Sequence, residues 1–143
     1  MLKEITISHL VKYEDLNHHG TLFAGRMAEW LVEASFIAAA RLVGQPEDVV
    51  CAQVHGMSFM APAARGDLVE IRTNVALLGA KSITVHAAVY ANERGEPIVT
   101  GMSTFVTVDQ SGKPYVHALT LPPAYIEQHR AIHGQALAIR NKK

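Results

Sequence analysis

The chain has 143 residues; 49% are hydrophobic, 18% are charged, and 13 basic residues balance 13 acidic ones to a formal net charge of zero. This length fits one domain that buries a sizeable core without a disulfide or a metal ion. The high apolar content excludes a mostly disordered chain. The lack of excess basic residues argues against a nucleic-acid binder. Because a net charge of zero does little to keep copies apart, we expect a homo-oligomer.

The cysteine and histidine content points to a chain without metal or disulfide chemistry. The single cysteine, Cys51, excludes an internal disulfide framework, and we expect a buried, unreactive thiol. The eight histidines show no zinc-like spacing, so we expect no metal and no cofactor. The sequence begins without the apolar run of a signal peptide and contains no membrane-spanning segment, which indicates a cytoplasmic protein without membrane contact.

The first half of the chain predicts a strand and a long helix. Partial alternation over residues 4–11 predicts the strand, and a polar loop follows. The segment from about 25 to 43 is rich in alanine and other helix formers, with Gly44 as its C-cap and Pro46 preventing continuation. Because apolar residues occupy nearly every side of this helix, we expect it to be buried all round.

The second half of the chain predicts a sheet. Four strand-like segments follow one another at short intervals: 49–59, 67–78, 82–90 and 98–108. Short links between strands require antiparallel neighbours. We therefore expect an α+β domain over residues 1–122, in the order β-α-β-β-β-β, and an exposed helical tail over 123–143. Four small residues lie off the main apolar rows and would let a second subunit approach closely: Ala76, Ala88, Gly101 and Ser103.

The loop before the helix is the most informative segment for chemistry. Residues 17–26 read Asn-His-His-Gly-Thr-Leu-Phe-Ala-Gly-Arg and run directly into the predicted helix. The first turn of a helix offers unpaired N–H groups and a positive dipole end, which polarise a carbonyl group. Asn17 could donate a hydrogen bond to that carbonyl group or hold a water molecule. The alternative is that these residues serve only turn geometry.

Two acidic residues interrupt the apolar helix four positions apart. Glu29 and Glu33 share one side of the helix. A carboxylate in an apolar environment suggests a general base with a raised pKa, and Glu33 is the candidate. The structural alternative is an ion pair between Arg26 and Glu29, with Glu33 reaching solvent or an interface.

Several linked motifs resemble those of the hotdog-fold acyl-CoA thioesterases, in particular the bacterial acyl-CoA hydrolases. The family loop Asn-x-x-Gly-Thr-hydrophobic-Phe-Gly-Gly is matched by residues 17–25, with Ala24 replacing one glycine. The other matches lie in Val54-x-x-Met57-x-Phe59-x-x-Pro62 with Arg65-Gly66-Asp67, in Gly79-Ala80-Lys81-Ser82, and in residues 104–112. The resemblance covers residues 5 to 122.

This resemblance implies a hotdog fold, in which a sheet wraps around the helix and two copies join their sheets. It further implies that water cleaves acyl-CoA at the dimer interface. The catalytic residues expected from the resemblance and the helix pattern are Asn17, Gly25 and Glu33. The expected substrate-binding residues are His18, His19, Gly20, Thr21, Phe23, Lys81 and Ser82. The family usually has an aspartate where this chain has Val32, and Glu33 is the neighbouring acid.

Other assemblies and activities remain open on the sequence. The dimer could assemble further into a tetramer or a hexamer. The alternatives to hydrolysis are a non-catalytic protein that binds acyl-CoA or an acyl carrier, and a hotdog hydratase in which His18 or His19 would pair with an acid.

Overall fold

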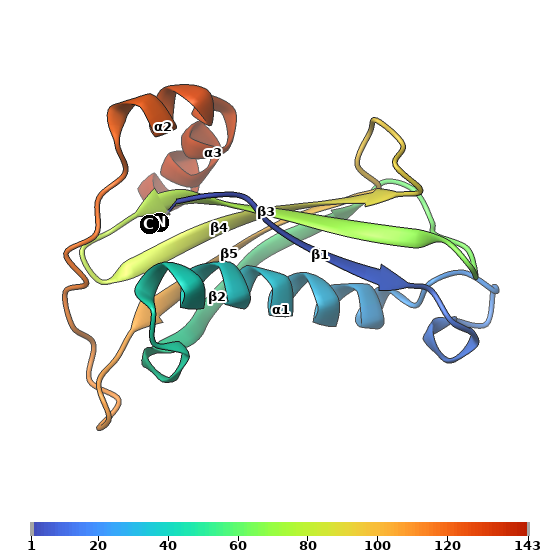
Figure 1. The fold of residues 1–143 in the computed structure, drawn as a ribbon, viewed down its shortest axis with the longest axis horizontal. Coiled ribbons are helices and arrows are strands. Elements are labelled where there is room, and N and C mark those ends of the chain that lie inside the picture. The colour runs from blue at the N-terminus through green and yellow to red at the C-terminus, as the bar shows by residue number, and fades with distance from the viewer. Residues whose placement is uncertain (1, 143) are drawn as a thin grey trace.

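The computed structural model describes residues 2–142, which form one antiparallel sheet with a long helix against one side and two short helices against the other (Figure 1). The elements are β1 (Ile5–Leu10), η1 (Tyr13–Asp15), α1 (Ala24–Val43), η2 (Pro46–Asp48), β2 (Val49–Phe59), β3 (Leu68–Leu78), β4 (Ser82–Ala91), β5 (Val99–Thr107), α2 (Pro123–Gln128) and α3 (Arg130–Asn141). The α+β class and the element order predicted from the sequence are confirmed.

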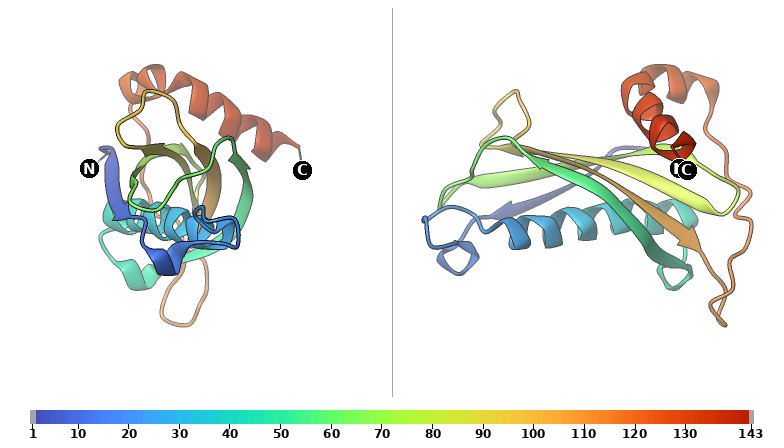
Figure 2. Two further views of the ribbon diagram at one scale, coloured as in Figure 1. Left: turned by 90° about the vertical axis from the view of Figure 1, so that its right-hand side faces the viewer. Right: turned by 180° about the vertical axis from the view of Figure 1, so that it is seen from behind.

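The sheet curves around α1 (Figure 2). Its strand order is β1-β3-β4-β5-β2, so β1 and β2 are the edge strands. The helix ends as predicted, because Gly44 takes the left-handed conformation at φ 86° and donates its N–H to the carbonyl of Ala40 at 2.8 Å. Glycine adopts that conformation without the steric cost that a Cβ atom imposes.

The core lies between α1 and the concave side of the sheet. The helix buries side chains at spacings of three and four residues: Met27, Trp30, Leu31, Ala34 and Ala38. Strands β3 and β4 contribute alternate residues: Val69, Ile71, Thr73, Ile83, Val85, Ala87 and Val89. Full burial of one large apolar side chain stabilises the fold by about 1.5–3 kcal/mol. The alternate apolar residues predicted along the strands are therefore the residues that pack against the helix.

Two burial predictions are wrong for the single chain. The side of α1 that carries Glu29 and Glu33 is exposed, so the helix is buried along one stripe and not all round. Cys51 is also exposed, because it lies on β2 and an edge strand has a neighbour on one side only. Most of β2 is exposed, including the large apolar side chains of Val50 and Val54.

Three of the four small residues predicted to admit a second subunit instead allow packing within the chain. A Cβ atom on Gly101 would lie 2.9 Å from a methyl carbon of Leu31, so glycine permits the helix to approach β5. Ser103 is fully buried on the same strand. Ala76 packs in a cluster with Ala136 of α3.

The tail also differs from its predicted exposure, because α2 and α3 are fastened to a bulge in β3. The bulge lies between Val75 and Leu77 and disturbs the regular pairing with β4. The Tyr125 hydroxyl donates to the carbonyl of Val75 at 2.6 Å, and His133 Nδ1 donates to the carbonyl of Ala76 at 2.8 Å. Burial raises the pKa of Tyr125 to about 12, so its hydroxyl remains a donor at neutral pH.

Candidate functional site

The loop between β1 and α1 is organised by the side chain of Asn17. Its Oδ1 accepts hydrogen bonds from the backbone N–H of His19 at 2.8 Å and of Thr21 at 3.2 Å. Its Nδ2 donates to Thr21 Oγ1 at 3.1 Å. Gly20 completes the turn at φ 81°. Asn17 thus performs the turn-forming role that the sequence left open, while its amide keeps a second N–H for another acceptor.

A pocket of about 280 Å³ opens beside Asn17. Its other lining residues are apolar and come from the start of α1, the end of β2 and the start of β5, and the largest of them are Leu22, Met27, Phe59, Met60, Ile98 and Val99. Asn17 is the one polar residue in the lining, counted over residues 2–142. The pocket therefore suits an aliphatic chain with a polar group placed at Asn17.

The first turn of α1 presents unpaired amide groups at the same place. Phe23 is the N-cap residue and its side chain makes no capping hydrogen bond. Within the described residues, no partner accepts from the backbone N–H groups of residues 24–26. Ala24 lines the pocket. A Cβ atom on Gly25 would lie 2.6 Å from the Phe23 ring, so glycine lets the ring pack against the helix start. Such amides are suited to stabilise a developing oxyanion.

A buried acid fixes the loop to the helix. Asp15 is 4% exposed; its carboxylate accepts from the Lys12 backbone N–H at 2.8 Å and lies 3.4 Å from Arg26 Nε. The backbone carbonyl of Asp15 accepts from the N–H of Phe23 at 2.8 Å. Arg26 also forms an ion pair with Glu29, with 3.5 Å between Arg26 Nη1 and Glu29 Oε1. This ion pair is the structural role that the sequence offered as the alternative for Glu29.

The remaining predicted binding residues divide between the two ends of the sheet. His18 and His19 are exposed in the loop, with ring centroids 3.9 Å apart. Lys81 and Ser82 lie at the turn between β3 and β4, which is at the end of the sheet opposite the start of α1 (Figure 1). One chain therefore does not bring Lys81 and Ser82 to the Asn17 pocket.

Glu33 lies on the β1 side of the helix. Trp30 stacks on His9 of β1 with ring centroids 4.2 Å apart, whereas Leu31 faces Gly101 of β5. Successive residues of a helix are rotated by about 100°. Glu33 therefore lies farther round the helix than Trp30 on the β1 side, and residue 32 lies farther round than Leu31 on the β2 side. Burial lowers the pKa of His9, and the nearby carboxylate of Glu33 opposes that shift. Glu33 is exposed and does not line the Asn17 pocket.

Over residues 2–142, no cluster of three or more His, Cys, Asp or Glu side chains is arranged to hold a metal ion. No helix in the same range has the length and hydropathy needed to cross a membrane.

The comparisons with known proteins agree with this geometry. The family model described as the thioesterase superfamily matches residues 19–98. The chain belongs to the thioesterase superfamily. It is 30% identical over 120 residues to the acyl-CoA thioester hydrolase YciA of Salmonella typhimurium, covering 78% of this chain and 87% of that protein. It is 28% identical over 134 residues to the uncharacterized acyl-CoA thioester hydrolase YkhA of Bacillus subtilis, covering 90% of this chain and 75% of that protein.

Solved structures extend this thioesterase relationship to the fold. An apo-hexameric acyl-CoA thioesterase superposes with a TM-score of 0.86 at 26% identity, covering 97% of this chain and 89% of that one. A hexameric thioesterase from Yersinia pestis gives a TM-score of 0.71 at 27% identity, covering 81% and 94%. The hotdog fold predicted from the resemblance is therefore confirmed.

Most of the pocket wall of this superfamily member carries no local signal in the sequence. Met27, Met60 and Ile98 come from three separate segments, and only the fold brings them together. Phe59 and Pro62 line the same pocket, and both belong to the Val54-x-x-Met57-x-Phe59-x-x-Pro62 motif, whose place in the site the sequence did not indicate.

Proposed function

We propose that the chain hydrolyses the thioester bond of acyl-CoA and releases CoA and a carboxylic acid. The observation that carries the proposal is the apolar pocket that meets Asn17 and the unpaired amides of residues 24–26 at one point. The membership of the thioesterase superfamily and the relatives named as acyl-CoA thioester hydrolases support it.

In the proposed mechanism, the acyl chain occupies the apolar pocket and the thioester carbonyl oxygen meets the start of α1. The amides of residues 24–26 stabilise the negative charge that develops on this oxygen as water attacks. The second N–H of Asn17 Nδ2 donates to the carbonyl oxygen or orients the water. The tetrahedral intermediate then expels the CoA thiolate, which takes up a proton.

A second copy would complete the site. Strand β2 is an unpaired edge with exposed apolar side chains, and such an edge pairs readily with another strand. Antiparallel pairing of two β2 strands sets the Phe59 end of one chain against the Val49 end of the other. That arrangement brings the partner subunit's Lys81 and Ser82 toward the Asn17 pocket, where they would contact the CoA portion. We propose this homodimer, with tetramers or hexamers of the same unit as further assemblies, in the cytoplasm.

One observation favours a second candidate function, which is binding of acyl-CoA without cleavage. Residue 32, where the family usually has its acid, is Val32 and projects toward β2, whereas Glu33 projects toward β1. The role of Glu33 as the general base stays a prediction. If Glu33 is the base, Glu33→Gln lowers turnover by at least about 10²-fold. Glu29→Gln on the same exposed side is the matched control, and unchanged turnover in Glu33→Gln would reject the assignment.

The deciding experiment is a free-thiol release assay over saturated acyl-CoA esters of increasing chain length. Hydrolysis predicts thiol release for esters whose chains fit the pocket, and Met27→Phe should shift the preference to shorter chains because it fills the pocket. Binding of the same esters in calorimetry without thiol release would establish the non-catalytic alternative. If the esters neither bind nor release thiol, both functions are rejected.

A further inference from the structure

The turn between β3 and β4 is held in place by the chain segment that begins at the end of β5. Three consecutive carbonyl groups of the turn accept hydrogen bonds from this segment. The carbonyl of Ala80 accepts from the backbone N–H of His117 at 3.2 Å, and the carbonyl of Lys81 accepts from that of Thr107 at 3.0 Å. The carbonyl of Ser82 accepts from His117 Nε2 at 3.0 Å. His117 therefore supplies two of these bonds, although it lies 35 positions from Ser82 in the chain.

The ring of His117 is fixed in one tautomer. Its Nδ1 accepts a hydrogen bond from the backbone N–H of Leu119 at 3.0 Å, so this nitrogen carries no proton. Nε2 then carries the proton of the neutral ring and donates to the Ser82 carbonyl. Between the two anchored residues, Ala118 has a left-handed backbone at φ 59°. This conformation is unfavourable for alanine and persists where neighbouring contacts hold it, which the two ring bonds do.

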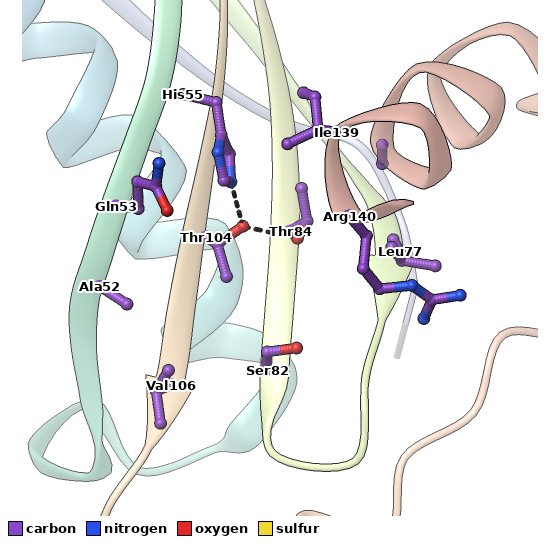
Figure 3. Close-up of a pocket in the computed structure, with 11 residues that line it drawn as sticks. Ala52, Gln53, His55, Leu77, Ser82, Thr84, Thr104, Val106, Ile139 and Arg140 are labelled. Atoms are coloured by element: carbon purple, nitrogen blue, oxygen red, sulfur yellow. Dashed lines mark hydrogen bonds between the residues drawn. The ribbon is translucent and has the colours of Figure 1, made fainter. Parts of the chain in front are cut away.

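The two polar side chains of the turn are not used to hold it. Within residues 2–142, the Lys81 ammonium group makes no ion pair and the Ser82 hydroxyl group makes no hydrogen bond. Ser82 lies at the start of β4, and its hydroxyl group points toward the β3 side (Figure 3). A Cβ atom on Gly79 would collide with Ser82 Oγ, so glycine leaves room for this hydroxyl group. The backbone of the turn is therefore fixed, while both polar side chains can bind a ligand.

We propose that His117 is a positioning residue for the substrate, because it holds the turn from which Lys81 and Ser82 contact the CoA portion of acyl-CoA. This inference rests on the proposed function, in which a second copy brings the turn toward the Asn17 pocket. A flexible turn loses conformational entropy when it closes on a ligand, whereas a turn whose carbonyl groups are already bonded has lost most of it before binding. His117 therefore acts on the affinity for the CoA portion and not on cleavage at the start of α1.

The test compares KM with kcat for one acyl-CoA ester in thiol release and measures the Kd of CoA itself by calorimetry. His117→Ala removes the bond to Ser82. It should raise KM and the Kd of CoA about tenfold, the upper range for one hydrogen bond, and leave kcat within about twofold of native. Native values of KM and Kd in His117→Ala would overturn the proposal, and so would a fall in kcat without a rise in KM.

Two conservative variants separate positioning of the turn from folding of the segment. His117→Gln places an amide N–H where Nε2 donates to Ser82, and His117→Asn places an amide oxygen where Nδ1 accepts from Leu119. We expect His117→Gln to restore the native KM and His117→Asn to keep the high KM of His117→Ala. The opposite order would assign His117 only to the shape of the segment and would refute the positioning role.

Tyr115→Phe is the matched control in the same segment. The Tyr115 hydroxyl group donates to Asp48 Oδ2 at 2.5 Å and not to the turn. Its loss should lower Tm and leave KM unchanged. An equal rise in KM in Tyr115→Phe and His117→Ala would mean that general loosening of the segment is responsible, which contradicts a specific role of His117.

Two readouts do not depend on hydrolysis. Nitrogen NMR of the His117 ring at neutral pH should show a proton on Nε2 and none on Nδ1, and a proton on Nδ1 would overturn the proposal. The Kd of CoA tests the positioning role even if the chain binds acyl-CoA without cleaving it. A native chain that neither releases thiol nor binds CoA would reject the proposed function and this inference with it, whereas native release with an unchanged KM in His117→Ala rejects this inference alone.

Discussion

Asn17 is predicted to have two separable roles, because its side chain builds the loop and its second N–H is free for substrate. The substitution Asn17→Asp keeps an oxygen that accepts from the backbone N–H groups of His19 and Thr21, at 2.8 and 3.2 Å in the native loop. It removes the Nδ2 donor. Asn17→Ala removes both the acceptor and the donor. Comparison of the two variants therefore distinguishes turn geometry from chemistry.

The expected magnitudes follow from these contacts. Loss of one preorganised donor to a developing oxyanion lowers turnover about 10²–10³-fold, so both variants should show that loss. Loss of the loop hydrogen bonds in Asn17→Ala should cost about 2 kcal/mol of unfolding free energy, since each contributes about 0.5–1.5 kcal/mol and the loop is partly exposed. That cost corresponds to a fall in Tm of about 5–10 °C. Asn17→Asp should stay within about 3 °C of the native Tm.

The assays are thiol release at saturating acyl-CoA and thermal unfolding of the same preparations. Thr21→Val is a matched control, because it removes the hydroxyl partner of Asn17 Nδ2 and keeps the Asn17 amide. Native turnover in Asn17→Asp would refute the donor role and leave Asn17 as a loop former. Native Tm in Asn17→Ala would refute the structural role.

Three further outcomes are expected. Gly101→Ala places a Cβ atom 2.9 Å from the buried Leu31 and should lower the free energy of unfolding by about 1–3 kcal/mol in denaturant, whereas Gly134→Ala in open space on α3 should be neutral or stabilising. Tyr125→Phe removes the hydrogen bond to the Val75 carbonyl in the β3 bulge and should lower the free energy of unfolding by about 1 kcal/mol. The variant should also exchange the amide hydrogens of α3 faster than the native chain does, while those of α1 are unchanged; equal exchange in native and variant chains would contradict the fastening role. Burial lowers the pKa of His86 below 6.5, so the unfolded chain binds protons first as pH falls and the unfolding free energy declines below about pH 6.5; His86→Gln should show a shallower decline, and an identical slope would contradict this.

The element order was readable from the sequence because each element carries a local signal. The apolar alternation of β4, the alanine-rich segment of α1 and the cap at Gly44 all depend on residues close together in the chain. The Asn17 loop was found for the same reason, since its hydrogen bonds span only two to four residues. Local energetics thus determined the fold class and the position of the polar loop at the helix start.

Only the tertiary structure decided which residues meet across the chain. Periodicity did not reveal that Gly101 faces α1, because its neighbour Met102 is more apolar and the helix side chain that requires the glycine lies seventy positions away. The β3 bulge, the exposed edge position of Cys51 and the side of α1 on which Glu33 projects also depend on strand pairing and helix rotation. Long-range packing sets these features, and no local pattern records them.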